Sequence, residues 1–268
     1  LLGQPRTTHS RLTFAQAFNS LGTTVFPYVG SILILGSLSQ VDVATLTGDA
    51  LQAYRAQETQ VVMQSYGALA AAIVLVAGLV WLRRDRLPPT PATDTPILQA
   101  FNLLWQPRFG YGALCIFLYV GGEVAIGSLI VNYLMSADVM GLGEQAAGKM
   151  VPLYWGGAMV GRFIGSYFLK VFSPGKVLAT VCAAVITLLL LSANTPGTTS
   201  GYALLAIGLC NSIMFPTIFS LACEGLGKRA AEGSGVICVA IVGGAVVPLL
   251  TGAAADMVGL KLALVVPA

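Results

Sequence analysis

Long hydrophobic stretches alternate with short polar segments along the chain. A transmembrane helix needs about 20 mostly apolar residues. Stretches of about this length lie near residues 14–37, 61–82, 111–134, 150–172, 177–194, 202–223 and 234–254. An eighth apolar run begins near Leu262, shortly before Ala268, and we expect the chain to stop inside it. The pattern predicts an incomplete polytopic membrane protein with seven spans and the start of another.

The apolar runs are continuous, whereas strands of a membrane barrel alternate apolar and polar residues at every second position. Several runs contain residues that bend or tightly pack membrane helices. These are Pro27, Pro152, Pro216, Pro248 and the pair Gly243-Gly244. We therefore predict an all-α fold, a polytopic bundle of bent transmembrane helices.

Composition agrees with a membrane location and excludes several functions. Charged residues make up 9% of the chain and hydrophobic residues 56%, whereas a soluble domain has about 25% charged residues. The net charge of +3 is small, and no basic run alternates with aromatics, so we expect no nucleic-acid partner. The five cysteines lie in apolar stretches without a CxxC pair, so we expect no metal or cofactor.

The basic residues predict which loops face the cytoplasm, because inside loops carry an excess of Lys and Arg. If the N-terminal segment is inside, the inside loops hold Arg6, Arg11, Arg83, Arg84, Arg86, Arg108, Lys170, Lys176, Lys228 and Arg229. The outside loops then hold Arg55, Lys149 and Lys261. The excess supports this orientation.

The longest inside loop covers about residues 83–109. It contains a proline-rich stretch, 87–91, and then a segment, 97–105, that could form an amphipathic helix at the membrane surface. A long basic inside loop is where a transporter with two helical bundles joins its halves. The alternative is an ordinary connecting loop.

Glu123 is the clearest candidate functional residue, because it lies almost at the centre of the span near 111–134. Ionisable groups inside a span are costly and are therefore functional candidates. A carboxyl group there could take up a proton or form hydrogen bonds with a hydroxylated ligand. The alternative is a structural carboxyl group bonded to a neighbouring helix.

A polar stripe marks the first span, where Gln16, Asn19, Ser20 and Thr23 share one helix face. Amide and hydroxyl groups suit a sugar, because they donate and accept hydrogen bonds without a charge. Polar contacts between helices are the alternative.

A third candidate is the segment 211–217, where Pro216 frees a backbone carbonyl beside Asn211. Kinked helices at mid-membrane are typical of substrate sites. Four further residues, Asn132, Tyr133, Tyr154 and Trp155, could stack on a sugar, although an aromatic belt at the outer membrane surface is the stronger interpretation.

Arg162 lies inside a span and is interpreted as a structural or gating residue. We expect it to pair with Glu224 or Glu232, as a latch that breaks when the inner side opens. The single histidine, His9, is expected to be a solvated loop residue. Enzyme motifs such as HExxH and GxSxG are absent from the sequence, so we predict no catalytic residues and no enzyme activity.

Five segments resemble the fucose/galactose/glucose permease branch of the major facilitator superfamily. They are RLTFAQAFNSLGT (11–23), FLYVGGEV (117–124), YWGGAMVGRFIGS (154–166), MFPTIFSL (214–221) and AIVGGAVVP (240–248). The resemblance implies twelve helices in two bundles of six, of which this chain would hold helices 5 to 11 and the start of helix 12. It implies that 1–82 ends the first bundle, 83–109 joins the bundles, and 110–268 forms the second bundle, truncated in its last helix.

The same resemblance implies functional residues. The sugar-contacting asparagine of the family matches Asn19, and the Gly-Gly-Glu at 121–123 is more similar to glucose/galactose permeases than to fucose symporters. The predicted substrate-binding residues are Asn19, Gln16, Glu123, Tyr119, Asn211 and Asn132.

The expected function is secondary active transport of a hexose such as glucose or galactose across the plasma membrane, in bacteria the inner membrane. The expected partners are a monosaccharide, a proton or sodium ion as coupling ion, and the lipid bilayer. A sugar sensor of the same fold that does not transport, or an exporter of another small molecule, is the alternative.

Overall fold

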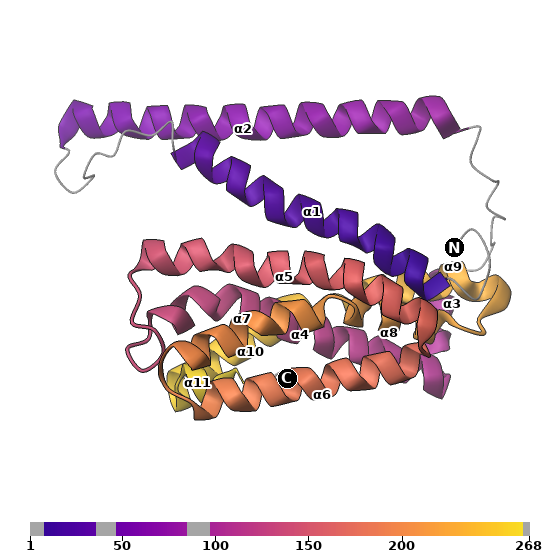
Figure 1. The fold of residues 1–268 in the computed structure, drawn as a ribbon. Helices are drawn as coiled ribbons and strands as arrows, with labels where there is room; N and C mark the ends of the chain where they lie inside the picture. Colours follow the sequence, from indigo (N-terminus) through magenta and orange to yellow (C-terminus); the bar gives the residue numbers. More distant parts are fainter. Residues whose placement is uncertain (1–7, 36–46, 85–96, 265–268) are drawn as a thin grey trace. The chain divides into compact units, whose positions relative to one another are not determined.

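The computed structural model describes residues 8–35, 47–84 and 97–264, and the regular structure in these ranges is helical, as predicted. The elements are α1 (Thr8–Leu35), α2 (Gly48–Arg83), α3 (Ile97–Ala100), η4 (Phe101–Trp105), α4 (Pro107–Met135), α5 (Glu144–Val171), α6 (Pro174–Asn194), α7 (Gly197–Asn211), α8 (Met214–Cys223), η5 (Gly227–Arg229), α9 (Ala230–Ala240), α10 (Gly243–Val258) and α11 (Leu260–Ala263). Figure 1 shows their order.

Among the described residues, five helical segments are long and apolar enough to cross a membrane. They are Gly48–Arg83, Pro107–Met135, Pro174–Asn194, Gly197–Cys223 and Gly227–Val258. The predicted spans near 14–37 and 150–172 form α1 and α5 but are not among the five. Helix α5 carries Arg162 and Lys170 within its predicted span. The eighth apolar run begins in α11, and residues 265–268 lie outside the described ranges.

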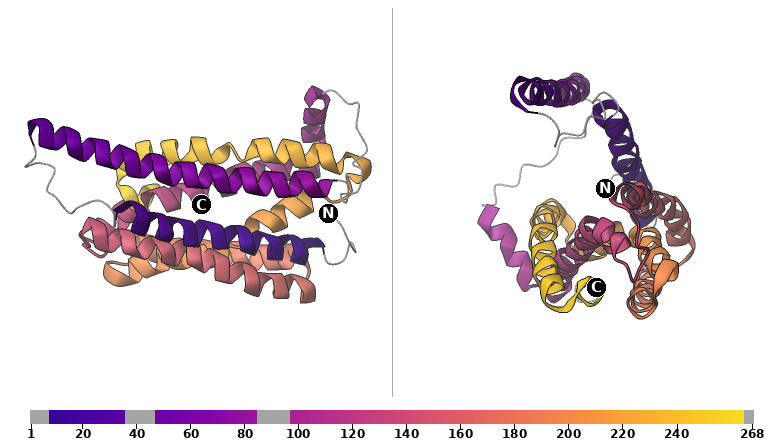
Figure 2. Two further views of the ribbon diagram at one scale, coloured as in Figure 1. Left: turned by 90° about the horizontal axis from the view of Figure 1, so that it is seen from above. Right: turned by 90° about the vertical axis from the view of Figure 1, so that its left-hand side faces the viewer.

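Two units are distinguished by their internal contacts: Leu1–Thr24 with Thr95–Ala268, and Val25–Asp94. In the second unit, α2 is exposed along almost all of its length. In the first, helices α4 to α10 run roughly along one direction, which the end-on view of Figure 2 shows. The domain boundaries expected from the sequence, 1–82, 83–109 and 110–268, stay a prediction.

A seam of glycines joins α5 to α7. Gly157, Gly161 and Gly165 recur at every fourth residue of α5. A Cβ atom on Gly161 would lie 2.3 Å from the Leu209 carbonyl oxygen, and one on Gly208 would lie 2.1 Å from that of Tyr154. Small residues at this spacing let membrane helices approach backbone to backbone. Side chains larger than hydrogen are therefore excluded from the seam.

A second close contact joins α10 to α4. A Cβ atom on Gly243 would lie 1.9 Å from the Phe117 carbonyl oxygen, and one on Gly121 would lie 2.4 Å from Val247 Cγ2. The pair Gly243-Gly244 thus serves helix packing, the use that the sequence predicted for it.

Two clusters of buried residues fill the first unit. We call them the outer and inner clusters, after the orientation that the basic residues predict. The outer cluster includes Ile130, Tyr133 and Leu204. The inner cluster includes Phe109 and Ile237.

Tyr133 belongs to the outer cluster and not to an aromatic belt. It is 1% exposed, and its hydroxyl lies 2.7 Å from Ser192 Oγ and 2.8 Å from Ser200 Oγ. The belt interpretation of Tyr133 is therefore wrong. The tyrosine faces the bundle interior, where Ser192 and Ser200 form hydrogen bonds with its hydroxyl.

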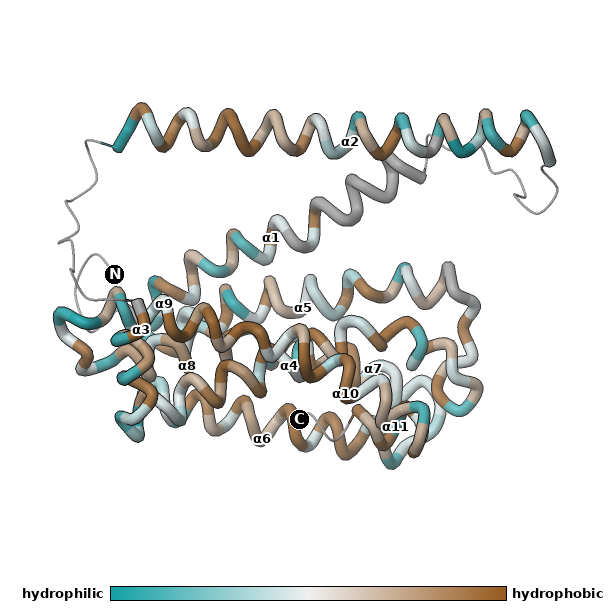
Figure 3. The backbone as a smooth tube through the Cα atoms, turned by 180° about the vertical axis from the view of Figure 1, so that it is seen from behind, coloured by the Kyte–Doolittle hydropathy of each residue, from teal (hydrophilic) through white to brown (hydrophobic). Residues whose placement is uncertain are grey.

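Polar residues gather at the two ends of this unit, and the middles of its helices are hydrophobic (Figure 3). At the outer end, Lys261 Nζ lies 3.0 Å from Asp138 Oδ2 and 3.2 Å from the Thr195 carbonyl oxygen. The hydrogen bond from Lys261 holds the pKa of Asp138 below its usual value. At the inner end, the predicted amphipathic segment is helical as α3 and η4, with Leu103 buried and Trp105 exposed.

Candidate functional site

The site is built on a break between α7 and α8. Helix α7 ends at Asn211 and α8 begins at Met214. Pro216 has no N–H group, so the Ser212 carbonyl, four residues earlier, receives no helical hydrogen bond from it. Arg162 Nε donates to this carbonyl at 2.9 Å. The prediction that Pro216 frees a carbonyl is confirmed.

A second carbonyl at the break is also bound by a side chain. The Tyr119 hydroxyl donates to the Asn211 carbonyl at 2.8 Å. Asn211 Nδ2 in turn donates to the Tyr154 hydroxyl at 3.0 Å, and this hydroxyl donates to the Glu123 carbonyl at 3.3 Å. The structure thus brings together three predicted residues, Glu123, Tyr119 and Asn211, from α4 and α7. We call these residues and Tyr154 the polar network.

Tyr154 is the member of the polar network that the sequence interpretation assigned elsewhere. It is 1% exposed, packs edge-on against Trp155 with ring centroids 5.1 Å apart, and links Asn211 to α4. The aromatic-belt interpretation of Tyr154 is therefore wrong. Its position near the end of an apolar run suggested the membrane surface, but the glycine seam draws this end of α5 against α7.

The side chain of Glu123 is partly exposed, whereas Tyr119, Tyr154 and Asn211 are buried. The Tyr119 hydroxyl and the Arg162 guanidinium lie close enough to interact with its carboxyl group. The carboxyl group therefore has a phenol and a cation nearby. Such an arrangement can bind a hydroxyl group or exchange a proton.

Arg162 also binds α1, within the first unit. Its Nη1 donates to the Gln16 carbonyl at 3.2 Å and to Ser20 Oγ. Ser20 is 1% exposed, so part of the polar stripe makes a contact between helices. Asn19 is exposed on α1, and the side chain of Thr23 lies outside the described set.

The expected pairing of Arg162 with Glu224 or Glu232 is wrong. Glu224 forms an ion pair with Arg108, and Glu232 lies 2.9 Å from Arg229. The Ser212 carbonyl is a closer acceptor for Arg162, because Pro216 leaves it free beside the guanidinium. A gating role for Arg162 and for Glu224 stays a prediction. Arg162 would act through the Ser212 carbonyl and Glu224 through Arg108, and not through each other.

His9 is not a solvated loop residue, and that expectation is wrong. It lies in the first turn of α1, and its Nδ1 is 2.5 Å from Ser220 Oγ of α8. The next residue, Ser10, donates from Oγ to the Ser166 carbonyl of α5 at 2.8 Å. Burial lowers the pKa of His9, and the nearby Glu224 carboxylate opposes this shift. The inner half of α1 is thus bonded to both α5 and α8.

Asn132 is a predicted residue that, like Asn19 and Gln16, is not part of the polar network. It lies nine residues beyond Glu123 on α4, about 13 Å along the axis at 1.5 Å per residue. Its side chain is exposed. A role in substrate binding stays a prediction for Asn132, as it does for the other predicted residues.

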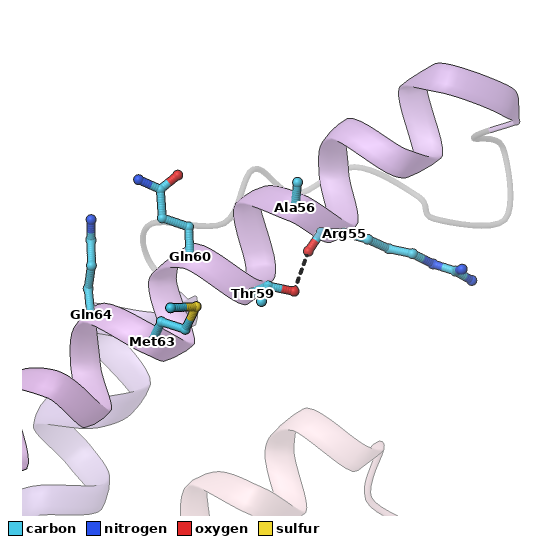
Figure 4. A pocket seen from close by; sticks show the side chains of 6 residues that line it. All are labelled: Arg55, Ala56, Thr59, Gln60, Met63 and Gln64. Atoms are coloured by element: carbon cyan, nitrogen blue, oxygen red, sulfur yellow. Dashed lines mark hydrogen bonds between the residues drawn. The ribbon is translucent and has the colours of Figure 1, made fainter.

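A hollow of about 560 Å³ lies far from this chemistry in the sequence, on α2. Figure 4 shows its six lining side chains, which all come from one helix, with Thr59 donating to the Arg55 carbonyl at 2.8 Å. Because a single exposed helix provides every wall, the hollow does not form a binding site. Among the described residues, no group of three or more His, Cys, Asp or Glu could hold a metal ion.

Membrane-length helices, glycine-packed contacts and a polar network at a broken helix define a polytopic helical membrane protein. Comparison with known families identifies it further. Residues 5–248 match the Major Facilitator Superfamily. The chain belongs to this superfamily, as the sequence resemblance implied.

Several of its relatives are named as sugar transporters. The chain is 45% identical over 270 residues to the glucose/galactose transporter of Brucella abortus, with 100% of this chain and 62% of the relative covered. It is 41% identical to the putative glucose/galactose transporter of Helicobacter pylori (92% of this chain, 58% of the relative). It is 31% identical to the L-fucose-proton symporter of Escherichia coli (97% and 61%). The resemblance to both groups is confirmed.

A crystal structure of the transporter FucP in the outward conformation has the same fold. It matches with a TM-score of 0.85 and 28% identity, over 99% of this chain and 66% of that chain. The chain of 268 residues thus spans about three fifths of the length of the curated relatives that it matches.

Proposed function

We propose that this protein serves in secondary active transport of a monosaccharide, glucose or galactose, across the bacterial inner membrane. The observation that carries the proposal is the polar network, which holds Glu123 beside Tyr119 and Arg162 at a broken helix. Half-helix ends and freed carbonyls at mid-membrane are typical of transporter binding sites. The names of the relatives supply the substrate class.

In this proposal the three buried residues of the network position Glu123, which is partly exposed. Tyr119 and Tyr154 use their hydroxyls on backbone carbonyls, so they fix α4 against α5 and α7. Glu123 is left to accept hydrogen bonds from sugar hydroxyls, and Asn19 and Gln16 of α1 are further candidates for binding the sugar. A carboxylate is the strongest acceptor available for a neutral polyol.

We further propose that a proton drives uptake and that the binding site alternates between the two sides of the membrane. One relative is named a proton symporter, and Glu123 is a group that can hold a proton. Sodium coupling is the competing possibility. The proposed partners are therefore the monosaccharide, the coupling ion and the bilayer. The proposal includes no enzyme activity.

The test is uptake of radiolabelled glucose and galactose by the full-length protein in vesicles, with and without an inward proton gradient. We expect gradient-dependent accumulation in the wild type. Glu123→Gln should weaken it about 10- to 100-fold, the factor that corresponds to losing a charged hydrogen bond worth about 1.5–3 kcal/mol. Asp256→Asn, an exposed acid at the far end of α10, is the matched control and should transport normally.

Three outcomes would count against the proposal. Unchanged uptake by Glu123→Gln would remove the role of this residue. Accumulation driven by sodium and not by protons would replace the coupling ion. Hexose binding without counterflow across the vesicle membrane would identify a sugar sensor of the same fold.

A further inference from the structure

A groove of about 530 Å³ runs between α5 and α6 and is lined by no residue of the polar network. Both helices pack along α7 but touch each other little, so the end of α7 and the break after it form the floor between them. Phe168 and Ile164 of α5 line one wall, Val177 and Thr180 of α6 line the other, and Ile213 lies on the floor. Nearly all of this lining is apolar.

The glycine seam accounts for the depth of the groove. Gly161 and Gly165 bring α5 down onto α7 without side chains of their own, and both glycines also line the groove. The aromatic side chains beside them are left uncovered: Phe168 is 45% exposed and Phe172 is 54% exposed. The groove is therefore an apolar surface that no other described part of the chain covers.

The length of the groove matches one leaflet of a bilayer. Its lining on α5 extends from Gly161 to Phe172, which is about 16 Å at 1.5 Å per residue. The hydrocarbon core of a bilayer is about 30 Å thick. A second helix would need a groove of the full thickness, whereas an acyl chain of one leaflet needs half of it.

The inner end of the groove is basic. Lys176 lines it in the first turn of α6, and Lys170 lies in the last turn of α5. Among the residues that the structure describes, no carboxylate pairs with either lysine. By the excess of basic residues, this end faces the cytoplasm, where the leaflet surface is negatively charged.

We infer that the groove between α5 and α6 binds one anionic phospholipid of the inner leaflet. An acyl chain lies over the end of α7 and the break after it, between Phe168 and Val177, and the phosphate of the headgroup lies at the Lys176 ammonium. The apolar lining selects for a lipid, and the lysine selects for negative charge. No residue of the polar network lines the groove, and the inference does not rest on the transported substrate.

The experiment measures lipid retention by the full chain, purified in mild detergent and mixed with phosphatidylglycerol or with phosphatidylethanolamine. Native mass spectrometry counts the bound lipids. Two variants attack the site: Lys176→Gln removes the charge, and Thr180→Phe fills the groove. Each has a matched control: Lys228→Gln removes an exposed lysine at the same membrane side, and Thr187→Phe places the same side chain at another exposed threonine of α6.

We expect the wild type to retain phosphatidylglycerol in preference to phosphatidylethanolamine. Lys176→Gln should weaken this retention about five-fold, the factor for one basic residue at a charged membrane surface. Thr180→Phe should reduce retention of both lipids, and the two controls should behave as the wild type. Thr180 is exposed, so the larger side chain leaves the fold intact.

Equal retention of the two lipids by the wild type would overturn the inference, as would equal effects of Thr180→Phe and Thr187→Phe. A dimer that Thr180→Phe dissociates would also overturn it, by identifying a second copy of the chain as the occupant. Because the readout is lipid binding, failure here is distinct from failure of the transport proposal.

Discussion

Two membrane-length segments are broken in the middle, and they satisfy their backbones in opposite ways. At the α9–α10 break, the chain bonds to itself: Ile241 N donates to the Cys238 carbonyl at 3.3 Å and Gly244 N to the Ile241 carbonyl at 2.9 Å. At the α7–α8 break, side chains from other helices bind the carbonyls of Asn211 and Ser212. The first is a packing joint built on glycine, and the second is a polar joint.

The difference comes from where proline stands relative to the break. Pro216 lies three residues after Ile213 and removes the donor to Ser212. Pro248 lies further into α10, after Gly243 has already passed Phe117 at close distance. A break that leaves carbonyls free offers them to partners such as Arg162, whereas at the α9–α10 break the carbonyls of Cys238 and Ile241 already accept turn-like hydrogen bonds. The polar joint is therefore the place where chemistry can be added.

The largest expected effect is at the packing joint. Gly243→Leu would drive a side chain into the Phe117 backbone, and we expect a loss of about 3 kcal/mol or failure to fold. Gly252→Leu on the same helix is the control, because a Cβ atom there meets nothing within 4 Å. Thermal unfolding in detergent and the yield of monodisperse protein measure both. Equal stability of the two variants would contradict the packing role.

The next effect is at the polar joint. Arg162→Met leaves the Ser212 carbonyl buried without its donor, and we expect a loss of about 2 kcal/mol. Arg108→Met removes an ion pair whose side chains are more than half exposed, so it should cost less than about 1 kcal/mol. Chemical or thermal unfolding compares the two variants. A larger loss for Arg108→Met would reverse the interpretation.

A double variant sharpens the comparison between the joints. Pro216→Ala restores an N–H group that can bond to the Ser212 carbonyl. In this background, Arg162→Met should cost about 1 kcal/mol less than in the wild type, because the carbonyl is no longer left bare. Pro248→Ala, at the packing joint, should leave the cost of Arg162→Met unchanged. Additive effects in both backgrounds would disprove the link between Pro216 and Arg162.

The smallest expected effect is a dependence on pH at the inner end of the polar joint. The pKa of His9 is lowered in the folded protein, so its contribution to stability is complete above the usual value of about 6.5 and decreases as the pH falls below it. Unfolding at pH 7.5 and at pH 5 should show this loss in the wild type but not in His9→Gln. An identical loss in the variant would assign it to other groups.

The sequence predicted the helices and much of the site, because both depend on local patterns. Apolar length predicts a span, and a proline predicts a freed carbonyl wherever the helix is placed. Glu123 stood out because a charge at mid-span is costly. The family resemblance matched Asn19, already part of the polar stripe, to a sugar-contacting asparagine.

The incorrect predictions concern which residues contact each other across helices, because a local sequence pattern does not specify contacts between distant residues. Charge favoured a carboxylate for Arg162, but a carbonyl freed by Pro216 lies nearer. Depth along the helix favoured the membrane surface for Tyr133 and Tyr154, but depth does not reveal which way a side chain faces. One signal was present and unused: glycine at every fourth residue of α5 predicts the close contact with α7.

That seam of glycines has a mechanical consequence. Helices in contact through their backbones cannot roll or slide over each other without collision, because no soft side chain lies between them. Helices α5 and α7 therefore move together as one rigid body. A movement of α1 that is passed to α5 through Ser10 and Ser20 therefore moves Asn211, at the end of α7, by the same amount. A change in the relative position of helices must then occur elsewhere, at the hydrogen bonds between α1 and α5.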